Sequence, residues 1–431
     1  MPAPTLILLH FTRNLRLAAN PALNAALRFG LPVAGVFVWP QHANPRQQTF
    51  LRQTLAELSD GLAAHGIPLH VLHGSAADAL NGLMARHPSA RLVTAQAVRL
   101  AGSEAANRVL RVQEEILAVP VMRHGADAAP PPDFSVFRQA WLRQAQADDG
   151  TDGEPDWAAA ERIQRSLPEE LRDVPPLPDA PDTPLLQQGG ETAAQAAWRA
   201  FVPKLALYPL LKDLPAQKGT SQLSAALRFG LLPVRALARE ALRQDAAQWL
   251  EGLVYADYCR RKMPFSDGLW TWENGGLREI LPSAPPPETP AADSARSEAL
   301  SRWQRGETGV PLVDAAMRSL VRSGWLHPRL RLLCAAFPAA LPDMPAAAAE
   351  RFFADTLADY DPALCRAGCR EAAAGRLKNP FVQSQHLDPD GRFIRSHLPE
   401  LAHLDSSLIH APHRAGSGIE RNGYPAPTAD F

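Results

Sequence analysis

Residues 219–227 place a glycine and three hydroxyl side chains, those of Thr220, Ser221 and Ser224, at the start of an amphipathic helical pattern. The first N–H groups of a helix have no partners within it, so short hydroxyl donors beside them form a site for phosphate oxygens. An ordinary Ser or Thr helix cap uses the same residue types. The segment therefore predicts either a phosphate-binding helix start or a plain cap.

The first part of the chain has the pattern of a different kind of structure. Short apolar runs alternate there with helical patterns, at 5–9, 33–39, 50–65, 68–72, 77–86 and 91–95. Repeated strand, helix and strand units with apolar strands indicate a parallel sheet covered by helices on both faces. We therefore expect a Rossmann-like α/β domain over residues 1–125.

The rest of the chain changes character twice. Residues 126–190 are rich in proline and acidic residues, which is typical of a linker that wraps a surface. After about residue 193 long helical periodicities follow, interrupted by a proline-rich stretch at 282–290. We expect an all-α domain over 191–431, and the hydroxyl-rich segment lies within it.

Bulk composition limits the function classes. With 431 residues, of which 46% are hydrophobic, the chain can bury two ordinary cores. Its formal net charge of -1 does not indicate a polyanion partner, so a nucleic-acid surface would have to be a local basic patch. The four cysteines form no CxxC pair and the N-terminus lacks a signal-peptide pattern, which favours a cytoplasmic location. We expect no metal site and no membrane partner.

Residues 303–331 carry many specified positions in a fixed order. The run resembles the signature of the photolyase and cryptochrome family, through Gly306, Thr308, Gly309, Pro311, Val313, Asp314, Ala315, Ala316, Met317, Arg318, Gly324, Trp325, His327, Arg329 and Arg331. Residues 11–23 resemble the opening segment of the family, and residues 379–401 resemble its closing motif. The resemblance is collinear over nearly the whole chain.

The resemblance implies FAD bound in the helical domain. It implies cofactor contacts at Tyr208, Thr220, Ser221, Leu223, Ser224, Trp249, Trp325, Arg331, Asp359, Asp361 and Cys365. Trp325, Arg331 and Cys365 would act catalytically beside the flavin ring, where a buried arginine stabilises negative charge. On residue types alone, the tryptophans could be core aromatics and Arg331 with Asp359 a structural ion pair.

Departures from the family pattern fall on the substrate side. Where repair enzymes have a glutamate and a tryptophan that contact the dimer, this chain has Gly252 and Tyr255, and Pro328 replaces a substrate-facing asparagine. We expect Tyr255 and Arg329 to be the substrate contacts that remain. An aromatic ring that stacks on a base contributes about 1 to 3 kcal/mol.

Two further departures concern the flavin. Cys365 stands where photolyases commonly place an asparagine that faces flavin N5, and a thiol is a weaker hydrogen-bond partner. Cys369 stands where the innermost tryptophan of the electron-transfer chain is usual. We expect photoreduction by the tryptophan route to be impaired.

Three functions are compatible with these features. The first is a blue-light-driven deoxyribodipyrimidine photolyase that repairs pyrimidine dimers in DNA, with the dimer flipped out of the duplex. The second is a cryptochrome-like flavin photoreceptor or redox protein without repair activity, and the third is a protein whose FAD is structural or lost. We rank repair first because the chain has no long tail after its closing motif. A second antenna chromophore stays open, and we expect a monomer.

Overall fold

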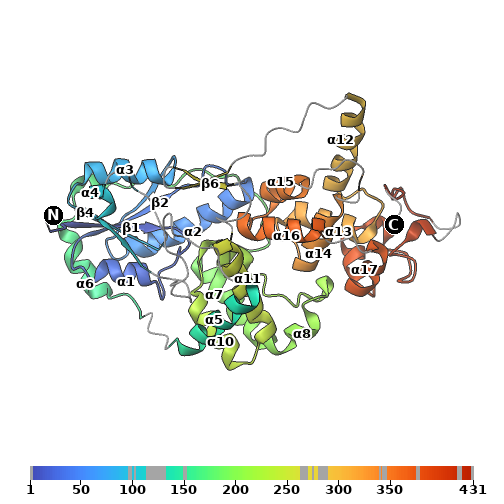
Figure 1. Cartoon of the computed structure of the whole chain (residues 1–431), viewed down its shortest axis with the longest axis horizontal. Coiled ribbons are helices and arrows are strands. Elements are labelled where there is room, and N and C mark those ends of the chain that lie inside the picture. Colours follow the sequence, from blue (N-terminus) through green and yellow to red (C-terminus); the bar gives the residue numbers. More distant parts are fainter. Residues whose placement is uncertain are drawn as a thin grey trace.

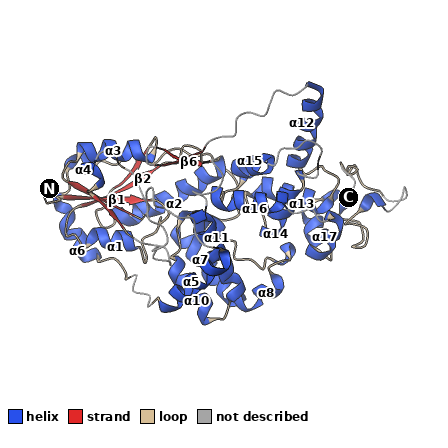
Figure 2. Cartoon of the chain, viewed as in Figure 1, coloured by secondary structure: helices blue, strands red, loops and turns tan. Residues whose placement is uncertain are grey.

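The computed structural model describes residues 3–95, 100, 103–112, 133–148, 153–262, 270–273, 276–279, 290–338, 341, 347–374, 379–414 and 420–428. The molecule is elongated, with the strands of the sheet at one end and helices filling the rest (Figures 1 and 2). The N-terminus lies at the sheet end and the C-terminus at the opposite, helical end. The predicted domain boundary at residue 125 lies outside the described residues.

The sheet has five parallel strands in the order β3-β2-β1-β4-β5. The strands are β1 (Leu6–Phe11), β2 (Val33–Val38), β3 (Leu69–Leu72), β4 (Ala90–Thr94) and β5 (Val109–Arg111). All six residues of the central strand β1 are buried, because both faces of the sheet are covered. The predicted α/β fold with a parallel sheet is confirmed, and β5 is a strand that the sequence patterns did not indicate.

Four helices lie between the strands, and the first three of them begin at recognisable caps. They are α1 (Pro21–Leu27), α2 (Pro45–Ala63), α3 (Ala76–Arg86) and the short α4 (Ser103–Ala106). Asn44 caps α2 with a capping box, in which its side chain accepts from Gln47 N at 2.9 Å. The Asn44 side chain also donates to Ala354 O at 2.6 Å and to Leu357 O at 2.9 Å. One asparagine therefore joins the α/β end of the molecule to the helical end.

Replacing Asn44 by alanine is expected to lower the free energy of unfolding by about 2 kcal/mol, because it removes a cap and two bridging bonds, one buried and one partly buried. Asn44→Ser retains a cap oxygen but cannot reach the two carbonyls, so its loss should be smaller. Chemical denaturation of both variants beside the wild type measures the difference. Equal stability of wild type and Asn44→Ala would show that the bridge contributes nothing.

The segment predicted to be a linker contains two helices, α5 (Phe134–Ala147) and α6 (Trp157–Ile163). The described part of the range 126–190 therefore contains packed helices as well as extended chain. The reason is visible in α5, where Phe137, Trp141 and Ala145 recur every fourth residue and are all buried. The proline-rich flanks obscured this apolar stripe.

Among the described residues after α6, the regular structure is helical apart from one hairpin. Its helices are α7 (Glu191–Phe201), α8 (Tyr208–Leu211), α9 (Ser224–Phe229), α10 (Val234–Arg243), α11 (Ala247–Lys262), α12 (Pro290–Arg305), α13 (Pro311–Ser323), α14 (Pro328–Ala336), α15 (Ala347–Thr356), α16 (Pro362–Ala374), α17 (Pro380–Leu387) and α18 (Arg392–His397). The hairpin pairs β6 (Trp270–Glu273) with β7 (Gly276–Glu279). It was not expected, although Asn274 and Gly275 are the residues that tight hairpin turns prefer.

The buried hydrophobic residues form three clusters, and these do not follow the boundary between the sheet and the helices. One core joins one side of the sheet to buried residues of α5, α7, α9, α10 and α11. A separate core is built from residues between 303 and 424. A third, smaller core covers the other side of the sheet. The helices from α5 to α11 therefore pack with the α/β domain. The boundary between the first and second cores is where this part of the molecule meets the helices of residues 303–424.

Candidate functional site

A tight turn between α13 and α14 presents Trp325. Gly324 at this turn has a φ of +67°, a conformation that favours glycine. Ser323 Oγ accepts from Trp325 N at 3.2 Å and holds the turn in shape. The indole Nε1 of Trp325 donates to Ser224 Oγ at 3.1 Å, across to the first residue of α9. The structure thus brings together two of the predicted cofactor residues, 101 positions apart.

An ion pair lies beside this turn. Arg331 Nη2 donates to Asp359 Oδ2 at 2.5 Å, and Arg331 Nε donates to Leu326 O at 2.8 Å. The side chain of Asp359 is 1% exposed, whereas that of Arg331 is 27% exposed. Within the described residues, Asp359 Oδ1 is buried and has no hydrogen-bond partner. A buried carboxylate oxygen without a donor is costly, so this atom points to a missing polar partner.

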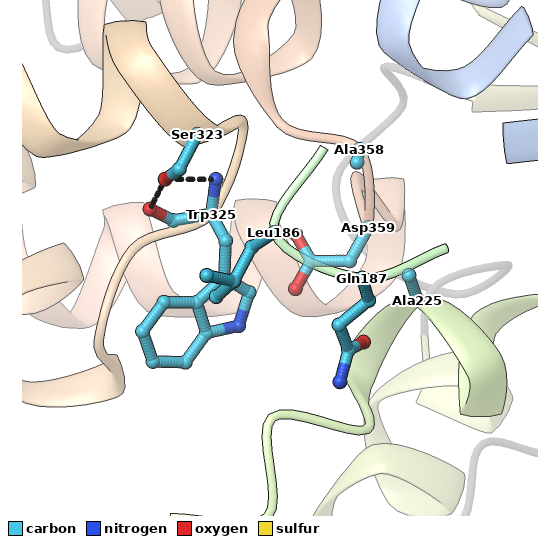
Figure 3. A pocket seen from close by; sticks show the side chains of 7 residues that line it. All are labelled: Leu186, Gln187, Ala225, Ser323, Trp325, Ala358 and Asp359. Carbon is cyan, nitrogen blue, oxygen red and sulfur yellow. Dashed lines mark hydrogen bonds between the residues drawn. The ribbon is translucent and has the colours of Figure 1, made fainter. Parts of the chain in front are cut away.

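A small cavity of about 10 Å³, room for about one water molecule, lies between four segments of the chain. Figure 3 shows the Trp325 indole and the Asp359 carboxylate on its walls. The other lining residues are Leu186, Gln187, Ala225, Ser323 and Ala358. Backbone bonds from Leu186 N to Ser323 O (3.1 Å) and from Ala358 N to Gly324 O (2.9 Å) hold the walls together. Ligand pockets usually measure about 300 to 1,000 Å³, so this cavity marks part of the wall of a site and does not by itself hold a dinucleotide.

The hydroxyl-rich segment precedes α9 rather than capping it. Leu223 occupies the cap position and makes no side-chain cap bond, so the plain Ser or Thr cap is excluded. Thr220 Oγ1 is buried and has no partner among the described residues. Gly219 is required here because an added Cβ would lie 2.3 Å from Leu211 Cβ. The segment thus offers an unsatisfied hydroxyl, which is what a phosphate-binding turn needs.

Asp361 lies close to three guanidinium groups. Arg260 donates to Asp361 Oδ2 at 2.8 Å, and Arg13 and Arg228 approach the same oxygen at 3.8 and 3.9 Å. Burial opposes ionisation, but Arg260, Arg228 and Arg13 outweigh it and hold the pKa of Asp361 well below its ordinary value. The arginines come from the β1–α1 loop, α9 and α11, so Asp361 ties three segments together. Sequence reasoning missed these partners.

The other predicted cofactor residues lie at different depths. Trp249 is 5% exposed and packs against Trp198, with ring centroids 5.0 Å apart, so it belongs to the first core. Tyr208 begins α8, and burial raises its pKa. Cys365 lies on α16 with its Sγ 3.9 Å from Cys369 Sγ. The cavity wall includes none of these three side chains.

The predicted substrate residues already have partners. Arg329 donates from Nε to Asp213 Oδ1 at 2.5 Å and from Nη2 to Asp213 Oδ2 at 3.2 Å. Tyr255 packs edge-on against Phe134, with ring centroids 5.8 Å apart. Arginines of the kind that a local basic patch for nucleic acid would need also form ion pairs, namely Arg228, Arg235, Arg239, Arg260, Arg261, Arg318 and Arg329. Local basicity is therefore weaker than the arginine count implies.

One residue of the site had no clear signal in the sequence. Gln187 reaches the cavity wall from the segment before α7, and its Oε1 is buried without a partner among the described residues. Its place in a proline-rich stretch gave no indication of this role. Asp314, by contrast, lies inside the recognisable 303–331 run, and its four hydrogen bonds in the structure give the residue a structural role.

Comparison with known proteins accounts for this arrangement. A family model described as DNA photolyase matches residues 7–150, and a model described as the FAD binding domain of DNA photolyase matches residues 278–431. A deoxyribodipyrimidine photo-lyase of Streptomyces griseus is 30% identical over 461 aligned positions, covering 98% of this chain and 95% of the relative. The chain therefore belongs to the photolyase and cryptochrome family.

Solved structures show the same fold. A class III photolyase from Agrobacterium tumefaciens matches with a TM-score of 0.74 and 23% identity, over 100% of this chain and 95% of that chain. A cryptochrome from Synechocystis matches with a TM-score of 0.73 and 22% identity, over 100% and 98% of the two chains. FAD is the cofactor of this family member. The unpartnered oxygens of Thr220, Gln187 and Asp359 agree with that cofactor, because a dinucleotide supplies both donors and acceptors.

Every described helix is too short or too polar to cross a lipid bilayer.

Proposed function

We propose that this protein is a blue-light-driven deoxyribodipyrimidine photolyase that repairs pyrimidine dimers in damaged DNA. The observation that carries the proposal is the Arg331–Asp359 pair on the edge of a cavity walled by Trp325, within a chain that aligns with a photolyase over nearly its full length. The proposal includes a cytoplasmic location, where free thiols such as the four cysteines of this chain persist.

Different residues of the site would bind different parts of the cofactor. Thr220 offers a hydroxyl for a phosphate oxygen, and the Trp325 indole supplies an apolar wall. Arg331 provides a positive charge that stabilises a negatively charged reduced ring, and the low local dielectric strengthens this attraction. The further proposed contacts are Tyr208, Ser221, Leu223, Ser224, Trp249, Asp359, Asp361 and Cys365.

When bound, FAD supplies the electron that splits the dimer under blue light. The protein must bring a flipped-out dimer to it, and Tyr255 on α11 offers an aromatic face on which a base can stack. Gly252 lies one turn earlier on the same helix, and an added Cβ there would meet no atom within 4 Å. The helix therefore has room for the carboxylate that repair enzymes of the family carry at this position.

Repair is tested on the full protein after chemical reduction of its flavin, with an oligonucleotide that contains a pyrimidine dimer. Under blue light the dimer should disappear relative to a dark control. Gly252→Glu should accelerate repair, whereas Gly252→Ala should not, because alanine matches the change in helix propensity without adding a carboxylate. If the reduced wild type removes no dimer in the light, repair is excluded and a photoreceptor or redox role without repair takes its place.

A further inference from the structure

The small cavity beside Trp325 must widen before it can take a cofactor. It has room for about one water molecule, whereas a ligand pocket usually measures about 300 to 1,000 Å³. Part of its wall therefore moves when FAD binds. Two walls carry the buried residues Ala225 and Ala358, and the Trp325 indole is bonded across to α9. The remaining wall carries Gln187 and Leu186, of which Leu186 is 44% exposed.

This remaining wall belongs to an extended segment, residues 183–190, which we call the strap. Both of its ends are tied to α2. At one end Thr183 Oγ1 lies 2.7 Å from Thr49 Oγ1, and at the other Gly189 N donates to Gln53 Oε1 at 2.7 Å. The ends of the strap are therefore fixed to a helix of the α/β domain.

The strap is longer than the distance between its two anchors. It advances six residues from Thr183 to Gly189, and six extended residues reach about 20 Å. The anchoring residues of α2 are four apart, which is about 6 Å along the helix axis. The excess chain bends at residues 186–187, just after Leu185, which packs against the first core. Residues 186–188 can therefore move while both anchors hold.

The middle of the strap contacts the helical end of the molecule at the cavity (Figure 3). Leu186 N donates to Ser323 O at 3.1 Å. Gln187 Oε1 and Asp359 Oδ1, from two different walls, are both buried and have no partner among the described residues. An acceptor buried without a donor is costly. The hydroxyl, imide and amino groups of a flavin dinucleotide are donors that could satisfy both oxygens.

We infer that the middle of the strap, residues 186–188, opens to admit FAD and closes over it when Gln187 bonds to the cofactor. This inference rests on the proposed position of FAD. Opening breaks the backbone bond from Leu186 to Ser323 and requires little new apolar exposure, because Leu186 is already exposed. Closing supplies Gln187 Oε1 with a donor. Because only the closed strap gains this bond, bound FAD shifts the strap toward the closed state.

The first test compares Gln187→Leu with the matched change Gln188→Leu, in FAD-loaded protein kept in the dark without DNA. Gln188 is the next residue along the strap and is exposed, so its replacement leaves the cavity wall intact. FAD release is followed by the rise in flavin fluorescence after dilution. Release should be about fivefold faster from Gln187→Leu than from the wild type, the effect of one lost hydrogen bond. Gln188→Leu should release FAD at the wild-type rate.

Amide hydrogen exchange measures the movement of the strap in the same three proteins. With FAD bound, the amides of residues 186–188 should exchange faster in Gln187→Leu than in the other two proteins. The amides of Gly189 and Gly190 should not change, because both donate to α2 side chains. Apo Gln187→Leu should be at least as stable to urea as apo wild type, because the oxygen that it removes has no partner to lose. A purely structural glutamine would instead lower that stability.

The outcomes separate this inference from the proposed function. It is wrong if Gln187→Leu and Gln188→Leu release FAD equally fast. It is also wrong if FAD fails to slow amide exchange at residues 186–188 of the wild type. Both measurements need neither light nor a dimer, so dimer repair by the wild type would still stand. Conversely, faster release from Gln187→Leu alone would support the strap even if the protein repaired no dimer.

Discussion

Replacing Arg331 by methionine is expected to lower the free energy of unfolding by about 3 to 5 kcal/mol, the usual effect of breaking a buried ion pair on one side. The partner, Asp359, has a side chain only 1% exposed and receives its charged hydrogen bond from Arg331. Without the guanidinium, this carboxylate would be buried with no opposite charge beside it. Denaturation of apo and FAD-loaded protein by urea measures the loss.

The double variant Arg331→Met with Asp359→Leu is the control for this effect. It removes both charges, so it should recover most of the lost stability, because an apolar pair of similar size often replaces a buried ion pair without cost. FAD occupancy should stay low in both variants, since the cation beside the ring is absent. A single variant as stable as the wild type would show that the carboxylate finds another partner or a proton.

Replacing Asp314 by alanine is expected to cost about 4 kcal/mol, because four donors lose one buried acceptor. The carboxylate accepts from Thr308 N at 2.8 Å, Thr308 Oγ1 at 2.6 Å, Gly309 N at 2.9 Å and the Tyr424 hydroxyl at 2.5 Å. It therefore joins the start of α13 to the C-terminal segment. Tyr424→Phe removes one of these bonds and should cost about 1 kcal/mol. Equal losses in the two variants would contradict the proposed network.

Asp314 also makes the free energy of unfolding depend on pH, in a direction that follows from its pKa. Burial raises the pKa of Asp314 to about 6, although its four hydrogen bonds oppose the shift. The unfolded chain has the ordinary value of about 3.9, so the folded protein binds this proton more tightly. The resulting stability, about 3 kcal/mol, is complete below about pH 4 and is lost as the pH rises through about 6.

Asp314→Asn cannot titrate, so its unfolding free energy isolates this effect. Relative to Asp314→Asn, the wild type should lose about 3 kcal/mol of its unfolding free energy between about pH 4 and about pH 7. Asp361 has the opposite sign, because its lowered pKa stabilises the fold above its unfolded value, and the stability is lost in acid. Comparing the two proteins cancels that contribution. An unchanged difference across this range would show that Asp314 is ionised throughout.

Periodicity and residue order by themselves determine much of this molecule. The apolar runs at 5–9 and 33–39 form neighbouring parallel strands, because uninterrupted apolar strands need cover on both faces. The 303–331 run identified the family, and with it the pairing of Arg331 with Asp359, whose charged atoms lie 2.5 Å apart. The strands follow from local periodicity. The ion pair follows from a family signature that can be recognised in a single sequence.

Only the tertiary structure decided which distant segments share a core and a site. Helices α5 to α11 pack with the sheet, and Gln187 joins the cavity from a stretch that looked like linker. The three arginines around Asp361 come from positions 101 to 348 residues away, and no periodicity encodes such encounters. Local pattern dictates which face of a helix is apolar, whereas side-chain fit between helices dictates which partner covers it. Sequence thus determined the fold and the cofactor, and packing decided which charges and thiols meet.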